Sequence, residues 1–228
     1  MVLYQVELLS RLRHPNLITL IGANPESMSL VYEYLPNQNL KHHLSNKHQL
    51  PWQGRISIGA DLCSALVLLH SSQPHSIVHG DVNPANIIMD ANFVAKLSDF
   101  GTCRVLSKYK DSTQYWKTDL IKGTPLYMDP EFIQSFELTT KSDVYAFGVV
   151  LLQLLIGRVH SGIIKEVKFA ADTGKLASIL DRVAGDWPFV QAEQLARLGL
   201  QCCEKDRKSR PDIHSVGRIL NAMRASFR

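Results

Sequence analysis

The stretch IVHGDVNPANIIMD, residues 77–90, decides the fold of this chain of 228 residues. It places an aspartate and an asparagine, Asp81 and Asn86, five positions apart in a polar turn. Apolar, β-branched runs flank the turn on both sides and predict two short strands. Two polar side chains of this kind, held between strands, are candidates for a chemical site.

A second carboxylate follows thirteen residues after Asn86, as Asp99 in the segment SDFGTCR. Phosphoryl transfer requires metal-held phosphates and an oriented nucleophile, because positioning and electrostatics supply most of the catalysis. One aspartate can accept the hydrogen bond of the hydroxyl, while a second aspartate and an asparagine bind metal ions. Asp81, Asp99 and Asn86 fit these three roles, although an Asp-Phe-Gly tripeptide alone is more often only a turn.

Five motifs occur in a fixed order along the chain. They are HGDVNPAN (79–86), DFG (99–101), GTPLYMDPE (123–131), SDVYAFG (142–148) and RKSRP (207–211). In this order they resemble a eukaryotic protein kinase domain of the receptor-like/Pelle type. The chain is most similar to the kinase domain of plant U-box proteins, which join a cytoplasmic kinase to a ubiquitin-ligase module. The resemblance covers essentially all of the chain.

The resemblance implies roles for individual residues. Asp81 corresponds to the catalytic-loop aspartate, and Asn86 and Asp99 correspond to the metal ligands. Asn83 occupies the catalytic position where the family usually carries a lysine. Thr124 corresponds to the threonine beside the substrate groove, which favours serine or threonine as the phosphate acceptor.

The same resemblance implies ATP and Mg²⁺ as cofactors. Glu33, Tyr34 and Leu35 would form the hinge that meets adenine, with Tyr32 as gatekeeper and Ile88 beneath the ring.

Structural roles follow from the resemblance as well. We expect Glu131 to pair with Arg210 and Asp143 to brace the catalytic loop through backbone amides. A stack of buried side chains would link the two lobes, formed by Leu9, Leu20, His79 and Phe100.

The expected fold is α+β, a kinase-like fold with an incomplete small lobe at 1–35 and a complete, mainly helical large lobe at 36–228. In the small lobe, apolar spacing predicts a helix over 2–13 and strands near 17–23 and 29–35. In the large lobe we expect helices at 39–48, 52–72, 142–157, 163–172, 175–181, 192–204 and 211–224. Short strands are expected at 76–80, 86–90 and 94–101, and residues 102–126 as an irregular segment.

Several features depart from the family pattern. In the family, a glycine-rich hairpin and a strand that carries a lysine come before the position of Met1. This sequence contains no G-x-G-x-x-G motif, and no U-box follows MRASFR. The resemblance is therefore to an N-terminally truncated kinase domain. In the family, a glutamate on the first helix pairs with that lysine, and Gln5 occupies its position here. Glu7 is nearby but lies on another face of the helix. Asn83 replaces a lysine. By analogy with a lost oxyanion donor, the loss of that lysine can raise the activation barrier by about 3–4 kcal/mol. Gly80 replaces the arginine that usually receives an activation-loop phosphate.

These departures favour a degenerate kinase domain, or pseudokinase, that acts by binding a partner kinase or ubiquitin ligase. The alternative is an active Ser/Thr kinase seen as a partial product, with a protein as substrate. Part of a U-box ubiquitin ligase is a third, weaker hypothesis. The activation segment offers four candidate phosphorylation sites: Ser112, Thr113, Thr118 and Thr124.

Composition excludes some classes of function. The net charge of +4 is mild and spread along the chain, which argues against nucleic acid as a partner. The four cysteines show no CxxC spacing, which indicates a reduced protein. The most apolar run, 145–157, is too short to span a bilayer. We expect no membrane insertion and a cytoplasmic location.

Overall fold

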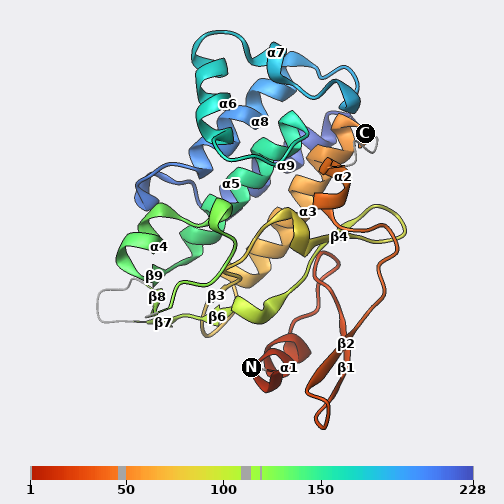
Figure 1. The fold of residues 1–228 in the computed structure, drawn as a ribbon, viewed down its shortest axis with the longest axis vertical. Coiled ribbons are helices and arrows are strands. Elements are labelled where there is room, and N and C mark those ends of the chain that lie inside the picture. The colour runs from red at the N-terminus through yellow and green to blue at the C-terminus, as the bar shows by residue number, and fades with distance from the viewer. Residues whose placement is uncertain (1, 46–49, 109–113, 119, 228) are drawn as a thin grey trace.

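The structure is a computed structural model that describes residues 2–45, 50–108, 114–118 and 120–227. Figure 1 shows one helix and a hairpin at one end of the molecule and a group of packed helices at the other. Short strands lie between these two parts. The predicted α+β class, with a small strand-containing end and a large helical remainder, is confirmed.

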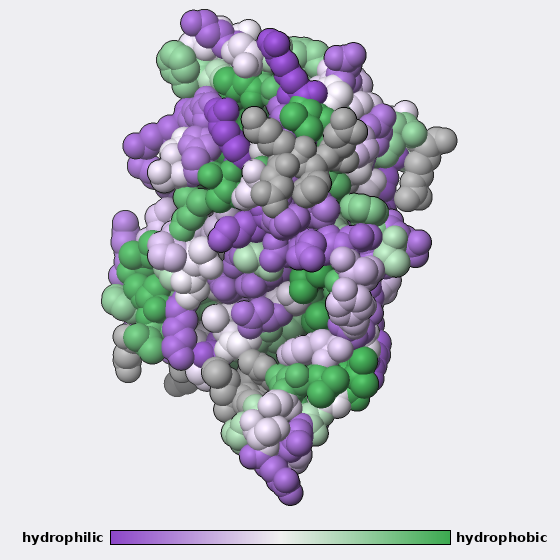
Figure 2. All heavy atoms as spheres, turned by 45° about the vertical axis from the view of Figure 1, so that its right-hand side comes forward, coloured by the Kyte–Doolittle hydropathy of each residue, from purple (hydrophilic) through white to green (hydrophobic). Residues whose placement is uncertain are grey.

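The small end consists of helix α1 (Val2–Arg11), strand β1 (Leu20–Asn24) and strand β2 (Ser29–Tyr32). The two strands are antiparallel, with Leu20 opposite Tyr32. The helix ends before Pro15, because a proline disfavours helical geometry in the residue that precedes it. Figure 2 shows a hydrophobic area over the lower end of one face, at the level of β1 and β2. The exposed apolar side chains of this hairpin include Ile21, Met28 and Val31.

Strand β1 starts later than predicted, because residues 16–18 pair with another strand. The N–H of Ile18 donates to the Leu97 carbonyl at 3.0 Å, and the N–H of Leu97 donates to the Asn16 carbonyl at 2.9 Å. The Asn16 side chain adds a bond to the Ala95 carbonyl at 3.0 Å. The small end is thereby joined to the large part through hydrogen bonds of the main chain.

The strands of the described residues form four small sheets. Strand β3 (Ile77–Val78) pairs with β6 (Arg104–Val105), and β4 (Ile87–Met89) pairs with β5 (Ala95–Leu97). A third sheet joins β7 (Ser107–Lys108), β8 (Gln114–Lys117) and β9 (Glu137–Leu138), and the fourth is the β1–β2 hairpin. The expectation that residues 102–126 are irregular is therefore wrong in part. Strands β6 and β8 pair with segments distant in the sequence, so local periodicity could not reveal them.

The helical part is built around α5 (Thr140–Ile156), of which nearly every residue is buried. Helix α5 packs against α3 (Trp52–His70) and α8 (Phe189–Cys202), and α3 packs against α9 (Ile213–Ala225). The remaining helices are α2 (Leu40–Ser45), α4 (Pro130–Ser135), α6 (Ile163–Asp172) and α7 (Leu176–Ile179). The sequence predicted all of these except α4. No described helix combines the length and the apolar character that a bilayer span requires.

Helices α5 and α8 approach closely where both carry glycine. A Cβ added to Gly148 would lie 2.6 Å from the Cβ of Cys202, and one added to Gly199 would lie 2.6 Å from a methyl group of Leu152. Real Cβ atoms do not approach other atoms this closely. The two glycines therefore set the distance between the two helices.

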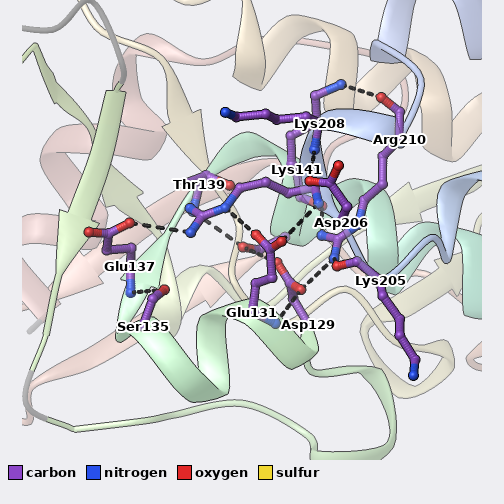
Figure 3. A network of polar contacts seen from close by, with 12 residues as sticks. Asp129, Glu131, Ser135, Glu137, Thr139, Lys141, Lys205, Asp206, Lys208 and Arg210 are labelled. Atoms are coloured by element: carbon purple, nitrogen blue, oxygen red, sulfur yellow. Dashed lines mark hydrogen bonds and ion pairs between the residues drawn. The ribbon is translucent and has the colours of Figure 1, made fainter.

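The expected pairing of Glu131 with Arg210 is wrong. Arg210 is fully buried and donates to Asp129 at 2.6 Å, while Glu131 pairs with Arg207 near the surface. Figure 3 shows this network between the start of α4 and the segment before α9. Asp129 is the N-cap of α4 and its carboxylate faces inward, whereas Glu131 lies in the first helical turn with its side chain partly exposed.

Arg210 satisfies three backbone carbonyls besides Asp129. Its guanidinium donates to the carbonyls of Lys141, Glu204 and Lys205 at 2.9, 2.7 and 3.1 Å. A buried charge is tolerated when it is paired and hydrogen-bonded in this way. The pair ties α4 to the loop after α8, across 81 residues of sequence.

We predict that Arg210→Met lowers the free energy of unfolding by about 3–5 kcal/mol, because the Asp129 carboxylate is left buried without its cation. The matched control is Arg207→Met, which removes a pair that is partly exposed and should cost no more than about 1 kcal/mol. Urea unfolding followed by circular dichroism measures both. Equal losses for the two variants would contradict the assignment of Arg210 as the central cation.

Candidate functional site

The turn at residues 83–86 is a short 3-10 helix, η1 (Pro84–Asn86), capped by Asn83. The side-chain oxygen of Asn83 accepts the N–H of Ala85 at 2.9 Å, and Pro84 supplies a fixed φ at the first helical position. The Asn83 amide nitrogen donates to the Asp81 carbonyl at 3.1 Å and to the Thr124 hydroxyl at 3.2 Å. Asn83 thus shapes the turn.

Asp81 joins the turn to the segment that contains Thr124. One carboxylate oxygen of Asp81 accepts both the N–H and the hydroxyl of Thr124, each at 2.8 Å. The other oxygen accepts the side-chain amide of Asn86 at 3.1 Å. The structure therefore brings the predicted residues Asp81, Asn83, Asn86 and Thr124 together.

Asp143 braces this turn from within α5, as predicted. Its two carboxylate oxygens accept the backbone N–H groups of His79 at 2.8 Å and Gly80 at 2.9 Å. His70, at the end of α3, bonds to the same carboxylate at 2.9 Å. Asp143 is almost fully buried, so these bonds are shielded from water.

His79 is completely buried, and burial lowers its pKa, which keeps the ring neutral near pH 7. A neutral ring has one donor and one acceptor nitrogen. Nε2 donates to the Ser98 carbonyl at 3.0 Å, while Nδ1 accepts the N–H of Asp81 at 3.3 Å. The ring also stacks edge-to-face on Phe100 with centroids 5.2 Å apart. Leu9 and Leu20, the other predicted members of the stack, are buried in the main core.

Asp99 is placed beside Asn86 by the pairing of β4 with β5. Ile87 lies opposite Leu97, and the N–H of Ser98 donates to the Asn86 carbonyl at 2.8 Å. Asp99 itself is left-handed, with φ 59° and ψ 79°. A non-glycine residue in this region is uncommon, and such residues gather at functional sites.

The donor atoms of Asn86 and Asp99 suit a hard cation. Asn86 donates through its nitrogen, which leaves an amide oxygen as a possible ligand beside the Asp99 carboxylate. Among the described residues, no group of three or more His, Cys, Asp or Glu side chains could hold a metal by itself. Mg²⁺ is commonly held by one or two side chains together with waters and phosphate oxygens. The pair fits that kind of site.

The predicted hinge lies between the two parts of the molecule. The Glu33 carboxylate accepts the N–H of Thr19 at 2.7 Å and Lys96 at 3.1 Å. Burial acts to raise the pKa of Glu33, but these hydrogen bonds outweigh it and lower the pKa. Tyr34 is 86% exposed, so its side chain points into solvent. The Glu33–Lys96 ion pair was not predicted from the sequence.

Tyr32 lies at the end of β2, and Ile88 lies on β4. Burial, with a contribution from the Asp99 carboxylate, raises the pKa of Tyr32. Ile88 bridges to Asn39, a few residues after the predicted hinge, and Leu35 is half-buried. The adenine-binding role of these residues stays a prediction.

Gly80 has a backbone reason to be glycine. Its φ is +81°, and a Cβ there would lie 3.2 Å from the Thr102 carbonyl oxygen. An arginine at this position would be strained in this conformation.

Other predicted positions lie at the edge of the described part. Glu7 pairs with Arg11 on the exposed face of α1, in agreement with its predicted orientation. The side chain of Gln5 and the candidate phosphorylation sites Ser112 and Thr113 lie outside the described residues.

The amino-acid sequence is similar to those of known proteins. The protein kinase domain family matches residues 2–219. U-box domain-containing protein 33 of Arabidopsis thaliana is 55% identical over 226 residues, covering 97% of this chain and 27% of that protein. U-box domain-containing protein 70 of Oryza sativa subsp. japonica is 50% identical over 225 residues, covering 96% of this chain and 28% of that protein. The chain spans little more than a quarter of the length of these relatives.

We predict that Asp99→Gly abolishes divalent-ion binding at the pair but changes the free energy of unfolding by no more than about 1 kcal/mol, since glycine adopts the left-handed conformation freely. Mn²⁺, used in place of Mg²⁺ and followed by electron paramagnetic resonance, reports the bound ion. The control is Met28→Gly, another left-handed position, exposed at the hairpin turn, which should leave ion binding unchanged. Undiminished Mn²⁺ binding by Asp99→Gly would contradict the assignment.

Proposed function

The chain belongs to the protein kinase domain family, and on that premise we propose that it is a degenerate kinase domain with weak or no phosphoryl transfer, acting in signalling by binding a partner. The observation that carries the proposal is Asn83, a neutral amide at the position of a transition-state cation. Its amide is engaged by the turn and by Thr124. It cannot neutralise charge on a transferred phosphoryl group.

In the described part of the chain, no lysine or arginine donates a hydrogen bond to Asp81, Asn86 or Asp99. Lys96, on the neighbouring strand β5, pairs with Glu33 instead. Loss of one electrostatic donor in a catalytic site costs about 3–4 kcal/mol of barrier, or a factor of 10²–10³ in rate.

Asp81 is also occupied. A carboxylate offers about four acceptor positions, and Thr124 and Asn86 together use three of them. One acceptor position is left for a substrate hydroxyl, which would share the carboxylate with Thr124 and Asn86. This sharing is compatible with weak catalysis.

The groups for nucleotide binding remain. Asn86 and Asp99 would hold Mg²⁺, and Tyr32, Glu33, Tyr34, Leu35 and Ile88 would surround adenine in ATP. Bound Mg²⁺ would neutralise the phosphates and fix their orientation. Glu33 would act through its backbone carbonyl, because its side chain is held by Thr19 and Lys96. In this proposal residues 1–35 belong to the small lobe and residues 36–228 to the large lobe of one domain.

The alternative function is an active Ser/Thr kinase that phosphorylates protein hydroxyls. The left-handed Asp99 and the intact brace of Asp143 favour it, since both hold site residues in defined positions. A native protein heavier than 25.6 kDa would also favour it. The relatives are named U-box domain-containing proteins, and on that family association we give a role as part of a U-box ubiquitin ligase as a third, weaker proposal.

We predict that the chain binds Mg·ATP but transfers phosphate to a generic protein substrate poorly, and that Asn83→Lys raises the transfer rate at least tenfold. Binding at 100 times the dissociation constant adds about 2.7 kcal/mol to the free energy of unfolding and raises the unfolding temperature. Radiolabelled ATP measures the transfer of phosphate. The double variant, Asn83→Lys combined with Asp81→Asn, gives the background rate of an inactive site. Wild-type transfer well above the Asp81→Asn background and equal to that of Asn83→Lys would overturn the proposal of a degenerate domain.

A further inference from the structure

A pocket of about 220 Å³ lies beside the catalytic turn, apart from the predicted metal ligands. It is bounded by strands β6, β8 and β9 and by helix α4, which lie side by side in Figure 1. Phe132 and Leu138 form an apolar floor and are almost fully buried, while Leu120 is exposed at the rim. The pocket therefore combines a hydrophobic base with access from solvent.

Two cations line this pocket, and no carboxylate does. Arg104 and Lys122 are the only charged residues among its described lining residues. Arg104 lies over the ring of Trp116, 5.8 Å from the centroid, and one of its nitrogens donates to the Cys103 carbonyl. Burial raises the pKa of Cys103 well above its usual value, so the neighbouring thiol is neutral and does not balance Arg104.

Gly80 keeps the pocket open. A Cβ at this position would point toward the Thr102 carbonyl oxygen at 3.2 Å and a methyl group of Leu138 at 3.5 Å, and both residues line the pocket. Any side chain at position 80 would therefore enter the pocket. Glycine, which the φ of +81° favours, leaves its base free.

Thr118 also lines the pocket, but its hydroxyl is engaged locally. It donates to the Leu120 carbonyl at 3.0 Å and accepts the N–H of Leu120 at 3.2 Å. This closed turn holds the hydroxyl against its own backbone and away from a phosphate donor. Among the described lining residues, none supplies an anion to Arg104 and Lys122.

We propose that this pocket docks an acidic partner segment in which carboxylates alternate with aromatic residues. The proposal rests on the proposed function, because it names the chemistry of the partner. Carboxylates match the two cations, and guanidinium–carboxylate bonds are among the stronger hydrogen bonds in proteins. Aromatic side chains match the floor of Phe132 and Leu138 and the exposed ring of Trp116. A peptide recognised in this way needs no nucleotide.

The test uses the 228-residue chain and a nine-residue peptide that alternates Asp with Phe. The chain has three tryptophans, and Trp52 and Trp187 stack on each other away from the pocket. The indole N–H signal of Trp116 in a nitrogen-15 NMR spectrum therefore reports the pocket, once Trp116→Phe has identified it. We expect the peptide to shift this signal saturably, with the other two indole signals unchanged.

Charge variants decide whether the cations are responsible. Arg104→Gln and Lys122→Gln should each weaken peptide binding at least tenfold, while Lys168→Gln, an exposed lysine on α6, should leave it unchanged. Arg104, and not Lys122, lies over the Trp116 ring, so the Lys122 variant remains informative if Arg104→Gln perturbs the ring. Asp119 adjoins two lining residues in sequence but lies outside the described part, so each titration is repeated with Asp119→Asn to remove a competing carboxylate.

Other outcomes would overturn the proposal. An equal shift with a peptide that carries Asn in place of Asp would show that charge does not matter. Inorganic phosphate that binds as tightly as the acidic peptide would show a simple anion site. No shift of Trp116 with any probe, in the parent chain or in Asp119→Asn, would exclude docking at this pocket. None of these results depends on ATP, so the outcome of the nucleotide experiment stands separately.

Discussion

The buried carboxylate of Asp143 is the constraint on which the catalytic turn depends. It accepts two consecutive backbone N–H groups, from His79 and Gly80, and a bond from His70 on a different helix. Because Asp143 belongs to the buried helix α5, the turn takes its position from the core of the helical part. The positions of Asp81, Asn83 and Asn86 follow, since all three are within six residues of the braced amides.

The small end is held by a different set of contacts. Main-chain pairing of residues 16–18 with β5 and the Glu33–Lys96 ion pair both join it to strand β5. Strand β5 also leads directly into Asp99. One short strand thus connects the hinge, the small end and a predicted metal ligand. The small end and Asp99 are thus joined to the same strand, in part through main-chain hydrogen bonds.

The sequence predicted what motifs and local periodicity encode. The helices with strong apolar spacing were placed within a few residues, and Asp81, Asn86 and Asp99 were brought together as the motif order implied. The partner of Arg210 was wrong because Asp129 and Glu131 are two residues apart, and only burial distinguishes them. Strands β6 and β8 and the Glu33–Lys96 pair depend on contacts between distant segments. Such contacts leave no periodic pattern in the sequence.

The left-handed backbone at Gly80 limits what can be exchanged at this position. The φ of +81° strains a residue that carries a Cβ, and the Thr102 carbonyl oxygen lies 3.2 Å from where that Cβ would stand. An arginine introduced here would meet two costs at once, one in its own backbone and one against a neighbouring carbonyl. A single substitution therefore does not suffice to place an arginine in this turn, because the segment around Thr102 would have to move as well.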